Sequence, residues 1–473
     1  MGTLSGLFDM SRSALAANQM ALNATANNVS NQNTAGYTDQ AVSFSAGATV
    51  TLSGAGSGST VMNSSGPQAT TTSTRDRVLE QRVQQQMQMQ SGTSAESAVV
   101  QQIQDVFNVT GSSSTTAGST QIGTALNSFF SSLTTLAGNP SDGPTQQGVL
   151  SAAQVVATTF NAASTQLSQV GSGINGAIST SVTAVNALTT TIAGLNQQIG
   201  EVSPNADAGT LEDQRQLAIE QLSQYVGLDQ ISTQGNGITL TTQGGAVLVQ
   251  GGTASALTAV TTNGTTQVQD SAGANVSAGI QGGSIGGQLT AQNVNLPAVT
   301  TALDALAYRI ATTVNAQNEA GMTTSGAAGG PIFNVPATAA GSAATISVIP
   351  TSASAIASAG PGEGESGNSN ANALANLAQT TNASGYTISD SLGSILTQVG
   401  SSSSSLQEQN TTQQATLTQL TTQRDSISAV SLDTEAANLS QYQKSYQAAA
   451  QLLTVLDSLM ATAINLGVDT AVS

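Results

Sequence analysis

The chain has 473 residues, with 8 Lys or Arg against 25 Asp or Glu, so its formal net charge is −17. A surface this acidic repels phosphate backbones and offers no basic cluster to anionic lipid, which argues against a nucleic-acid partner and against membrane binding. Because cysteine and histidine are both absent, a disulfide framework, a Cys or His metal site and a Ser-His-Asp triad are excluded, and we expect neither a cofactor nor catalysis.

The N-terminal residues predict an amphipathic helix followed by an Asn-rich turn. Large apolar residues recur on one helical face, at Leu4, Phe8, Leu15, Leu22 and Val29, with Leu7, Ala14 and Ala21 beside them. The pattern stops where four asparagines gather, at Asn27, Asn28, Asn31 and Asn33. Asparagine favours caps and turns over helix interiors. Gly36 then lets the chain bend, and residues 37–44 alternate weakly, as an extended segment does.

Neither end predicts a targeting or membrane-spanning segment. Residues 1–13 include Asp9 and have no basic region before an apolar core, so we expect no cleaved secretory signal peptide. The most apolar stretch, 446–466, approaches the ~20 residues of a membrane span. Polar residues such as Gln451 and Asp457 interrupt it. We therefore expect an amphipathic helix there and no membrane insertion.

The middle of the chain is dominated by helical periodicity. Residues 47–74 predict an extended connector, and 75–107 a helix that Gly92 interrupts. The longest periodic segment repeats every seven residues, at Phe160, Leu167, Ile174, Ser181, Leu188 and Leu195, with a companion row at Ile178, Val185, Ile192 and Ile199. Such a repeat predicts long helices packed side by side. Thr210 and Asp213 have the spacing of a capping box that opens a further helix.

A change in composition at Leu228 predicts a small β unit. Turn signals for hairpins follow at Asn236-Gly237, Gly244-Gly245 and Asn263-Gly264. Helical periodicity returns in 289–317 and again in 392–427, and the Gly- and Ala-rich stretch between them, 326–370, predicts a surface excursion.

The C-terminal segment carries two apolar rows at a spacing of seven. One row comprises Leu432, Leu439, Tyr446, Leu453 and Met460, and the other Tyr442, Ala449, Leu456 and Ala463. Neither terminal helix has a local partner in sequence, so we expect each to pack on the other or on neighbouring copies. The apolar rows predict a polymerisation interface if neighbouring subunits complete them, and an ordinary core if they do not.

The predicted fold is mainly α with β insertions: terminal amphipathic helices form a coiled-coil end domain, long helices form a middle bundle, and a small β unit is inserted. The predicted segments are 1–74, the N-terminal part of a discontinuous end domain; 75–227, 286–325 and 371–430, the three parts of the helical bundle domain; 228–285, the β insertion; 326–370, the short surface excursion; and 431–473, the C-terminal helix of the end domain.

Three patterns could suggest chemistry, and each has a simpler explanation. The GxGxxG match at 171–176 follows helical residues with no preceding strand, so it does not predict a nucleotide site. Glu363 and Glu365 lie in a Gly-rich loop, where solvated charges are expected. Asp207, Glu212 and Asp213 gather near a helix start, which helix N-terminal charges explain better than paired catalytic carboxylates.

Both ends resemble one family. The sequence ANNVSNQNTAGYT, with Asn27, Asn28, Asn31, Thr34, Gly36 and Tyr37, resembles the N-terminal signature of bacterial flagellar rod, hook and hook-associated proteins. The stretch 431–466 resembles their C-terminal helix, and Gln441-Tyr442-Gln443 with Tyr446-Gln447 is most similar to the members that form the first junction between hook and filament. Ala35 and Asp39 depart from the family pattern, which has Pro and Arg there.

The resemblance implies a non-enzymatic, extracellular subunit of the flagellum, exported by the flagellar secretion apparatus and assembled as a ring on the hook. It implies contacts with other copies, the hook protein and a second junction protein, and a cytosolic export chaperone on the C-terminal helix. The expected assembly residues are the N-terminal row Leu4, Phe8, Leu15, Leu22 and Val29, facing Leu439, Tyr442, Tyr446, Leu453 and Leu456. Two alternatives stay open: another axial component of hook or rod, and a non-flagellar surface fibre or adhesin.

Overall fold

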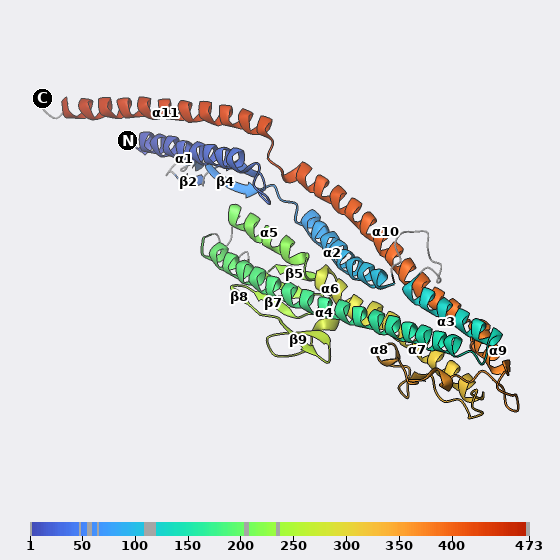
Figure 1. The fold of residues 1–473 in the computed structure, drawn as a ribbon. Helices are drawn as coiled ribbons and strands as arrows, with labels where there is room; N and C mark the ends of the chain where they lie inside the picture. The colour runs from blue at the N-terminus through green and yellow to red at the C-terminus, as the bar shows by residue number, and fades with distance from the viewer. Residues whose placement is uncertain are drawn as a thin grey trace.

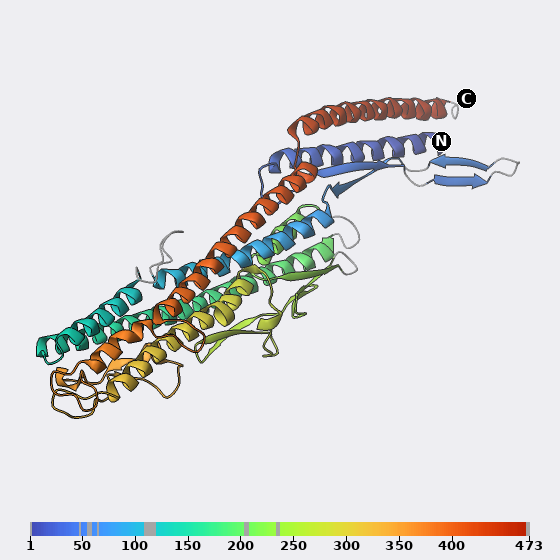
Figure 2. The ribbon, with the colours of Figure 1, turned by 90° about the vertical axis from the view of Figure 1, so that its right-hand side faces the viewer.

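A computed structural model describes residues 2–46, 49–53, 59–63, 66–107, 120–202, 208–232 and 237–469. The molecule is elongated, with the first and last helices side by side at one end and a bundle of long helices extending away from them (Figures 1 and 2). The predicted fold class, mainly α with small β units, is confirmed. No helix in the described ranges combines the length and hydropathy needed to cross a bilayer.

The end domain is built from both ends of the chain. Helix α1 (Gly2–Asn31) packs along α11 (Leu432–Asp469). Two antiparallel ladders follow α1: β1 (Gln40–Ser45) pairs with β4 (Gln68–Ser73), and β2 (Thr49–Ser53) pairs with β3 (Ser59–Asn63). The predicted connector at 47–74 is therefore largely a β-ribbon that folds back on β1.

Long, nearly aligned helices dominate the helical domain, and several short helices accompany them (Figure 2). Its helices are α2 (Arg77–Val106), α3 (Gln121–Gly138), α4 (Gly143–Val202), α5 (Thr210–Ser223), α6 (Gly283–Thr290), the π-helical turn η3 (Ala291–Asn295), α7 (Leu296–Glu319), α8 (Ser342–Thr345), α9 (Ser369–Asn376) and α10 (Ile388–Ser428), with short 3₁₀ turns η2 (Ser277–Gly279), η4 (Ala353–Ala355) and η5 (Leu377–Gln379).

The seven-residue repeat forms the spine of this domain. Helix α4 is 60 residues long, and its companion row is fully buried at Ile178, Val185, Ile192 and Ile199. The first row is buried as well, except that Leu188 is half-buried. Helices α3, α5 and α7 and most strands of the β unit contact α4. The sequence repeat thus identified the central helix of the core.

The β unit packs against the flank of α4. Its sheet has the antiparallel order β5 (Leu228–Ser232), β6 (Ile238–Thr242), β7 (Val247–Gln250), β8 (Thr253–Ala254), followed by the hairpin β9 (Thr258–Thr262) and β10 (Thr265–Gln269). The predicted turn at Asn263 and Gly264 is confirmed, with φ of 52° and 79°. Gly245 turns β6 into β7 as predicted, whereas Asn236 lies outside the described residues.

The predicted surface excursion lies closer to the core than expected. Strand β11 (Phe333–Asn334) pairs with β12 (Ser347–Val348), and Ile332, Phe333 and Ile346 are at most 1% exposed. The side chain of Asn315 on α7 accepts hydrogen bonds from the Ile332 and Phe333 N–H groups at 2.9 and 2.8 Å. Short apolar pairs inside a Gly- and Ala-rich stretch carry little periodic signal, so sequence reasoning placed them at the surface.

Gly92 does not interrupt its helix, contrary to prediction. Helix α2 runs through it without a break, and the missing side chain lets α6 approach closely. A Cβ atom on Gly287 would lie 2.0 Å from the Gly92 carbonyl oxygen, and one on Gly92 would lie 3.2 Å from the Gly283 carbonyl oxygen. The glycine therefore serves helix packing, which offsets its low helix propensity.

We expect Gly287→Ala to destabilise the helical domain by about 1–3 kcal/mol, because the added methyl must push α2 and α6 apart. The matched control is Gly148→Ala on α4, where a Cβ would meet nothing within 4 Å. That change is expected to stabilise the protein by about 0.5–1 kcal/mol. Thermal unfolding followed by circular dichroism distinguishes the two, and equal effects of the same sign would contradict the close-packing explanation.

Candidate assembly interface

The paired helices α1 and α11 are the candidate interface. The covered face of α1 consists mainly of small residues, at Ser11, Ala17, Ala21, Ala24, Thr25 and Asn28, and α11, β1 and β4 pack on this helix. The predicted row lies at the edge of that face: Phe8, Leu15 and Leu22 are half-buried, and Val29 is 39% exposed. The side chain of Leu4 lies outside the described residues.

The predicted residues of α11 lie on its covered side. Leu439, Tyr442, Tyr446 and Leu453 are half-buried and Leu456 is 7% exposed. The Tyr442 ring lies 5.9 Å from that of Phe44 on β1, measured between centroids. The other side of α11 exposes a second apolar stripe, at Leu452, Val455 and Leu459, each between 51% and 57% exposed. One chain therefore covers only part of the apolar surface of its own terminal helices.

The Asn-rich signature holds α1 to the strand that follows it. Asn27 and Asn28 lie inside α1, which continues to Asn31, so the predicted helix end came too early. The Asn28 amide donates to the Asp39 carboxylate at 2.6 Å and accepts from the Tyr37 hydroxyl at 2.8 Å and the Gln40 N–H at 3.1 Å. A buried asparagine whose hydrogen bonds are all made is well tolerated in a helix.

Gly36 and Thr38 bring the signature turn onto α5 of the helical domain. Gly36 has a φ of +78°, and a Cβ there would lie 3.1 Å from Leu217. The Asp213 carboxylate accepts from the Thr38 hydroxyl at 2.6 Å and from its N–H at 3.2 Å. The predicted capping box is therefore wrong: Gly209 is the N-cap, without a side-chain cap bond, and Asp213 binds the end domain instead.

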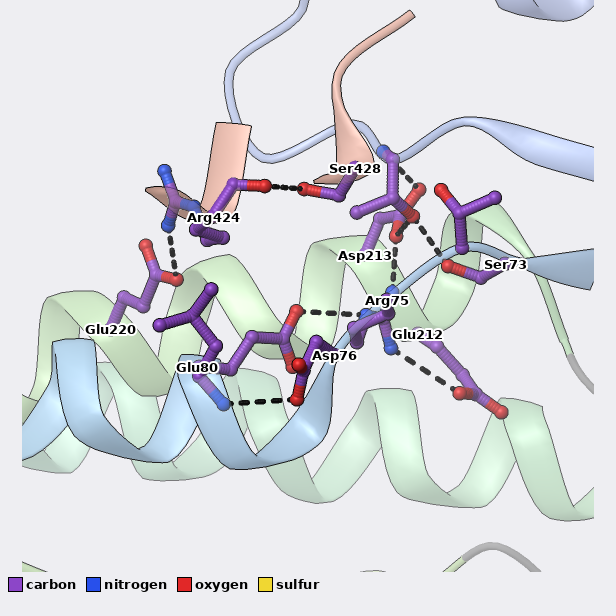
Figure 3. A network of polar contacts seen from close by, with 12 residues as sticks. Ser73, Arg75, Asp76, Glu80, Glu212, Asp213, Glu220, Arg424 and Ser428 are labelled. Atoms are coloured by element: carbon purple, nitrogen blue, oxygen red, sulfur yellow. Dashed lines mark hydrogen bonds and ion pairs between the residues drawn. The ribbon is translucent and has the colours of Figure 1, made fainter. Parts of the chain in front are cut away.

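Arg75 lies at the centre of a buried ion-pair network between the two domains (Figure 3). It precedes α2, and its guanidinium pairs with Glu80 at 3.1 Å, with Glu212 at 3.3 Å and with Asp213. All four side chains are at most 8% exposed. Glu212 and Asp213 are thus not merely charges at a helix start, whereas Asp207 lies outside the described residues. Sequence reasoning placed Arg75 at the start of a helix and missed its ion pairs.

Burial raises the pKa of Glu80 to about 7, although Arg75 lowers it. When the pKa of a carboxyl group is higher in the folded than in the unfolded chain, its contribution to stability is complete at pH values below the pKa in the unfolded chain. That contribution is lost as the pH rises through the folded pKa. The contribution of Glu80 to the contact between the end domain and the helical domain, called the joint below, is therefore lost between about pH 5 and pH 8.

Helix α10 contributes to the same joint at its C-terminal end. Arg424 pairs with Glu220 of α5 at 2.9 Å, and the Ser428 hydroxyl donates to the Arg424 carbonyl at 2.9 Å (Figure 3). The carbonyl of Ser428 accepts the Asp39 N–H at 2.8 Å. The segment before β1, the start of α2, α5 and the end of α10 are thus held together where the end domain meets the bundle.

The other candidate sites have structural roles. The GxGxxG match lies within α4. The Glu363 carboxylate accepts from the Gly360 and Ser369 N–H groups at 2.8 and 3.2 Å, which closes its loop and lowers its pKa. Within the described ranges, no three acidic side chains are arranged to hold a metal ion.

Three family models match successive parts of the chain. "Flagella basal body rod protein" matches residues 8–38, "Flagellar hook-associated protein FlgK helical domain" matches 100–333, and "Flagellar basal body rod FlgEFG protein C-terminal" matches 422–466. The two outer matches fall on α1 with its signature turn and on α11, and the central match falls on the bundle and its β unit. Paired terminal helices on such a bundle define a flagellar axial protein.

Individual relatives show which flagellar axial proteins the chain is similar to. Flagellar hook-associated protein 1 of Bacillus subtilis (strain 168) is 30% identical over 98% of each chain. The protein of that name from Escherichia coli (strain K12) is 29% identical over 70% of this chain and 60% of its own length. The solved structure of "the flagellar hook junction protein FlgK" from Burkholderia pseudomallei shares the fold, with a TM-score of 0.66 at 19% identity over 73% of this chain and all of that one.

The chain belongs to the flagellar hook-associated protein 1 family, and it is a structural protein of the hook–filament junction of the bacterial flagellum. The resemblance identified from the two ends of the sequence is confirmed.

Proposed function

We propose that this protein assembles into a ring on the hook tip through α1 and α11 and thereby connects hook to filament. The observation that supports this is the apolar stripe at Leu452, Val455 and Leu459, which stays exposed although α11 already packs on α1. Contiguous exposed apolar residues of this kind mark interaction sites. A neighbouring copy that covers the stripe would complete an inner tube of terminal helices.

In this proposal, the helical domain forms the outer part of the ring and adapts the hook to the filament above it. The partners are other copies, the hook protein and the second junction protein. Before export the same C-terminal helix, with Leu439, Tyr442, Tyr446, Leu453 and Leu456, is covered by a flagellar export chaperone. The protein leaves through the flagellar secretion apparatus without a cleaved signal peptide, and its role is structural and not catalytic.

A buried charge on α1 tests this proposal. Ala21 is fully buried, so Ala21→Asp places an unpaired carboxylate under the packed face of α1 and is expected to prevent docking of α1. Asn23→Asp adds the same charge at an exposed position of the same helix and is the matched control. We expect cells with Ala21→Asp to stop spreading in soft agar and to release the exported protein into the medium.

Cells with Asn23→Asp are expected to spread normally. Immunogold labelling of purified flagella should place the unsubstituted protein between hook and filament. Normal spreading with Ala21→Asp, together with its presence in purified flagella, would contradict assembly through α1.

A further inference from the structure

The glycines of the GxGxxG match lie together in the middle part of α4, beside the start of α7. A Cβ atom on Gly171 would lie 3.2 Å from the Leu296 side chain, whereas one on Gly173 or Gly176 would meet nothing within 4 Å. Glycine weakens a helix interior relative to alanine, because it loses more backbone freedom on folding. The 60-residue helix α4 therefore has a weak segment where α7 begins.

The chain that passes this segment of α4 is irregular as well. Between α6 and α7 it makes the π-helical turn η3, and Pro297 follows in the first turn of α7. Proline has no N–H to donate, and π turns and prolines are usual causes of helix kinks. Gln292 of η3 donates to the Thr266 carbonyl at 3.0 Å, and the Thr266 N–H donates to Asn175 of α4 at 3.1 Å. Strand β10 thus joins the two irregular segments.

Helices α2 and α10 each contain a run of small residues with low helix propensity. On α10, Gly400 is followed by five consecutive serines at 401–405. On α2, the run is Ser-Gly-Thr-Ser at 91–94. Serine forms helices less readily than alanine or leucine, and adjacent glycine and serine are a further usual cause of kinks.

Hydrogen bonds place these runs at the same level along the bundle. The Gln90 amide of α2 donates to the Asn410 side chain of α10 at 3.1 Å. Continuing this antiparallel register outward brings Glu96 level with about Ser404, since both helices rise equally per residue. Glu96 in turn accepts from Asn295 of η3 at 2.8 Å. We call the four segments together the weak level: 91–94, 171–176, 291–297 and 400–405.

Packing also changes at the weak level. Before it, α10 buries large apolar side chains such as Leu392, Leu396 and Val399. After it, none of the side chains at 407–427, all of which the structure describes, is buried. A cavity of about 460 Å³ lies beside Gly92, between α2, α6 and α10. Few buried apolar contacts and an adjoining cavity leave little to resist movement there.

We infer that the weak level is a transverse flexure, at which the outer part of the bundle, with α3 and α9, bends relative to the part that carries α5 and the joint. A bundle bends most easily where its long helices all have a weak segment at one level. The consequence rests on the proposed function: in a ring whose inner tube is fixed, the flexure lets the outer helices follow the bending hook.

The experiment measures the spread of distances across the weak level. The chain has no cysteine, so introduced cysteines carry the only spin labels. Ser128→Cys on α3 and Gln221→Cys on α5 are exposed positions on the two sides of the weak level (Figure 1). Double electron–electron resonance on the isolated, labelled protein gives the width of the distance distribution.

Two triple variants of the labelled protein are compared with the unsubstituted one. The stiffened variant changes glycines of the weak level: Gly173→Ala, Gly176→Ala and Gly400→Ala. The matched control changes glycines elsewhere on the same two helices: Gly148→Ala, Gly194→Ala and Gly393→Ala. At all of these positions a Cβ atom would meet nothing within 4 Å, so both variants are expected to fold, and circular dichroism checks this.

We expect the stiffened variant to narrow the distribution by about one third, because alanine removes the backbone freedom of glycine. The control should keep the width of the unsubstituted protein. Equal widths in all three folded proteins would overturn the flexure. Equal narrowing in both variants would overturn it too, since the weak level would then have no special part. The measurement needs no ring, whereas absence of the unsubstituted protein from purified hooks would refute the proposed function alone.

Discussion

Deleting residues 432–473 is expected to leave completed hooks without filaments, and flagellin is expected to be shed into the medium. The deletion removes α11, and with it the one described helix that packs along α1 and every residue of the exposed stripe on α11. Electron microscopy of the source bacterium counts hooks with and without filaments, and an immunoblot of the medium measures the shed flagellin. We expect filaments to be lost completely in the deletion strain, because no other described helix packs along α1.

The outcome also tests the proposed role of α11. Normal filaments on the deletion strain would mean that assembly at the junction does not require α11, which would contradict the proposed ring. Loss of the hooks themselves would mean that the C-terminal helix is needed before the junction is built. The matched control removes only residues 470–473, which lie outside the described residues. That strain should build normal filaments.

Replacing Arg75 by methionine is expected to be the most destabilising single substitution at the joint. It leaves Glu80, Glu212 and Asp213 buried without their shared cation. Breaking a buried pair on one side typically costs about 3–5 kcal/mol. The loss should be larger at pH 8 than at pH 5, because Glu80, whose pKa is raised to about 7, is protonated at the lower pH and then needs the guanidinium less.

Arg82→Met is the control for Arg75→Met, since Arg82 is exposed on the same helix, α2. We expect a change within about 0.5 kcal/mol for this exposed position. Thermal unfolding at the two pH values, followed by circular dichroism, measures both variants. Equal midpoints for Arg75→Met and the unsubstituted protein at pH 8 would mean that the network does not hold the domains together.

The sequence predicted those parts of the fold whose signal is local and periodic. The heptad rows of α4 and the turn at Asn263 and Gly264 were correct, because each depends on residues within a few positions of one another. The prediction that Gly92 interrupts its helix was wrong, since a glycine within a helical pattern indicates either a helix break or a closely packed neighbouring helix. The neighbour here, Gly287, lies far away in sequence, so no local pattern could decide.

The candidate site was predicted less completely for the same reason. Asp213 stands at a spacing that fits a capping box, but its partners Thr38 and Arg75 come from a different part of the chain. On α1, large apolar residues indicated the approximate face, whereas small residues such as Ala17 and Ala21 are the most deeply buried. Alanines recurring every three or four positions could have indicated this close contact.

The discontinuous end domain also constrains when the protein can mature. Helix α1 ends at Asn31 and α11 begins at Leu432, so their contacts span roughly 400 positions of chain, and contacts of that span are slow to close. During synthesis, and whenever the unfolded chain passes through a narrow channel, α1 has no packing partner until α11 follows. The bundle encoded between the two helices can form before that. In the proposed assembly, α11 therefore acts as a completion check: only a chain that includes α11 can close the end domain and present the surface on which a neighbouring subunit would dock.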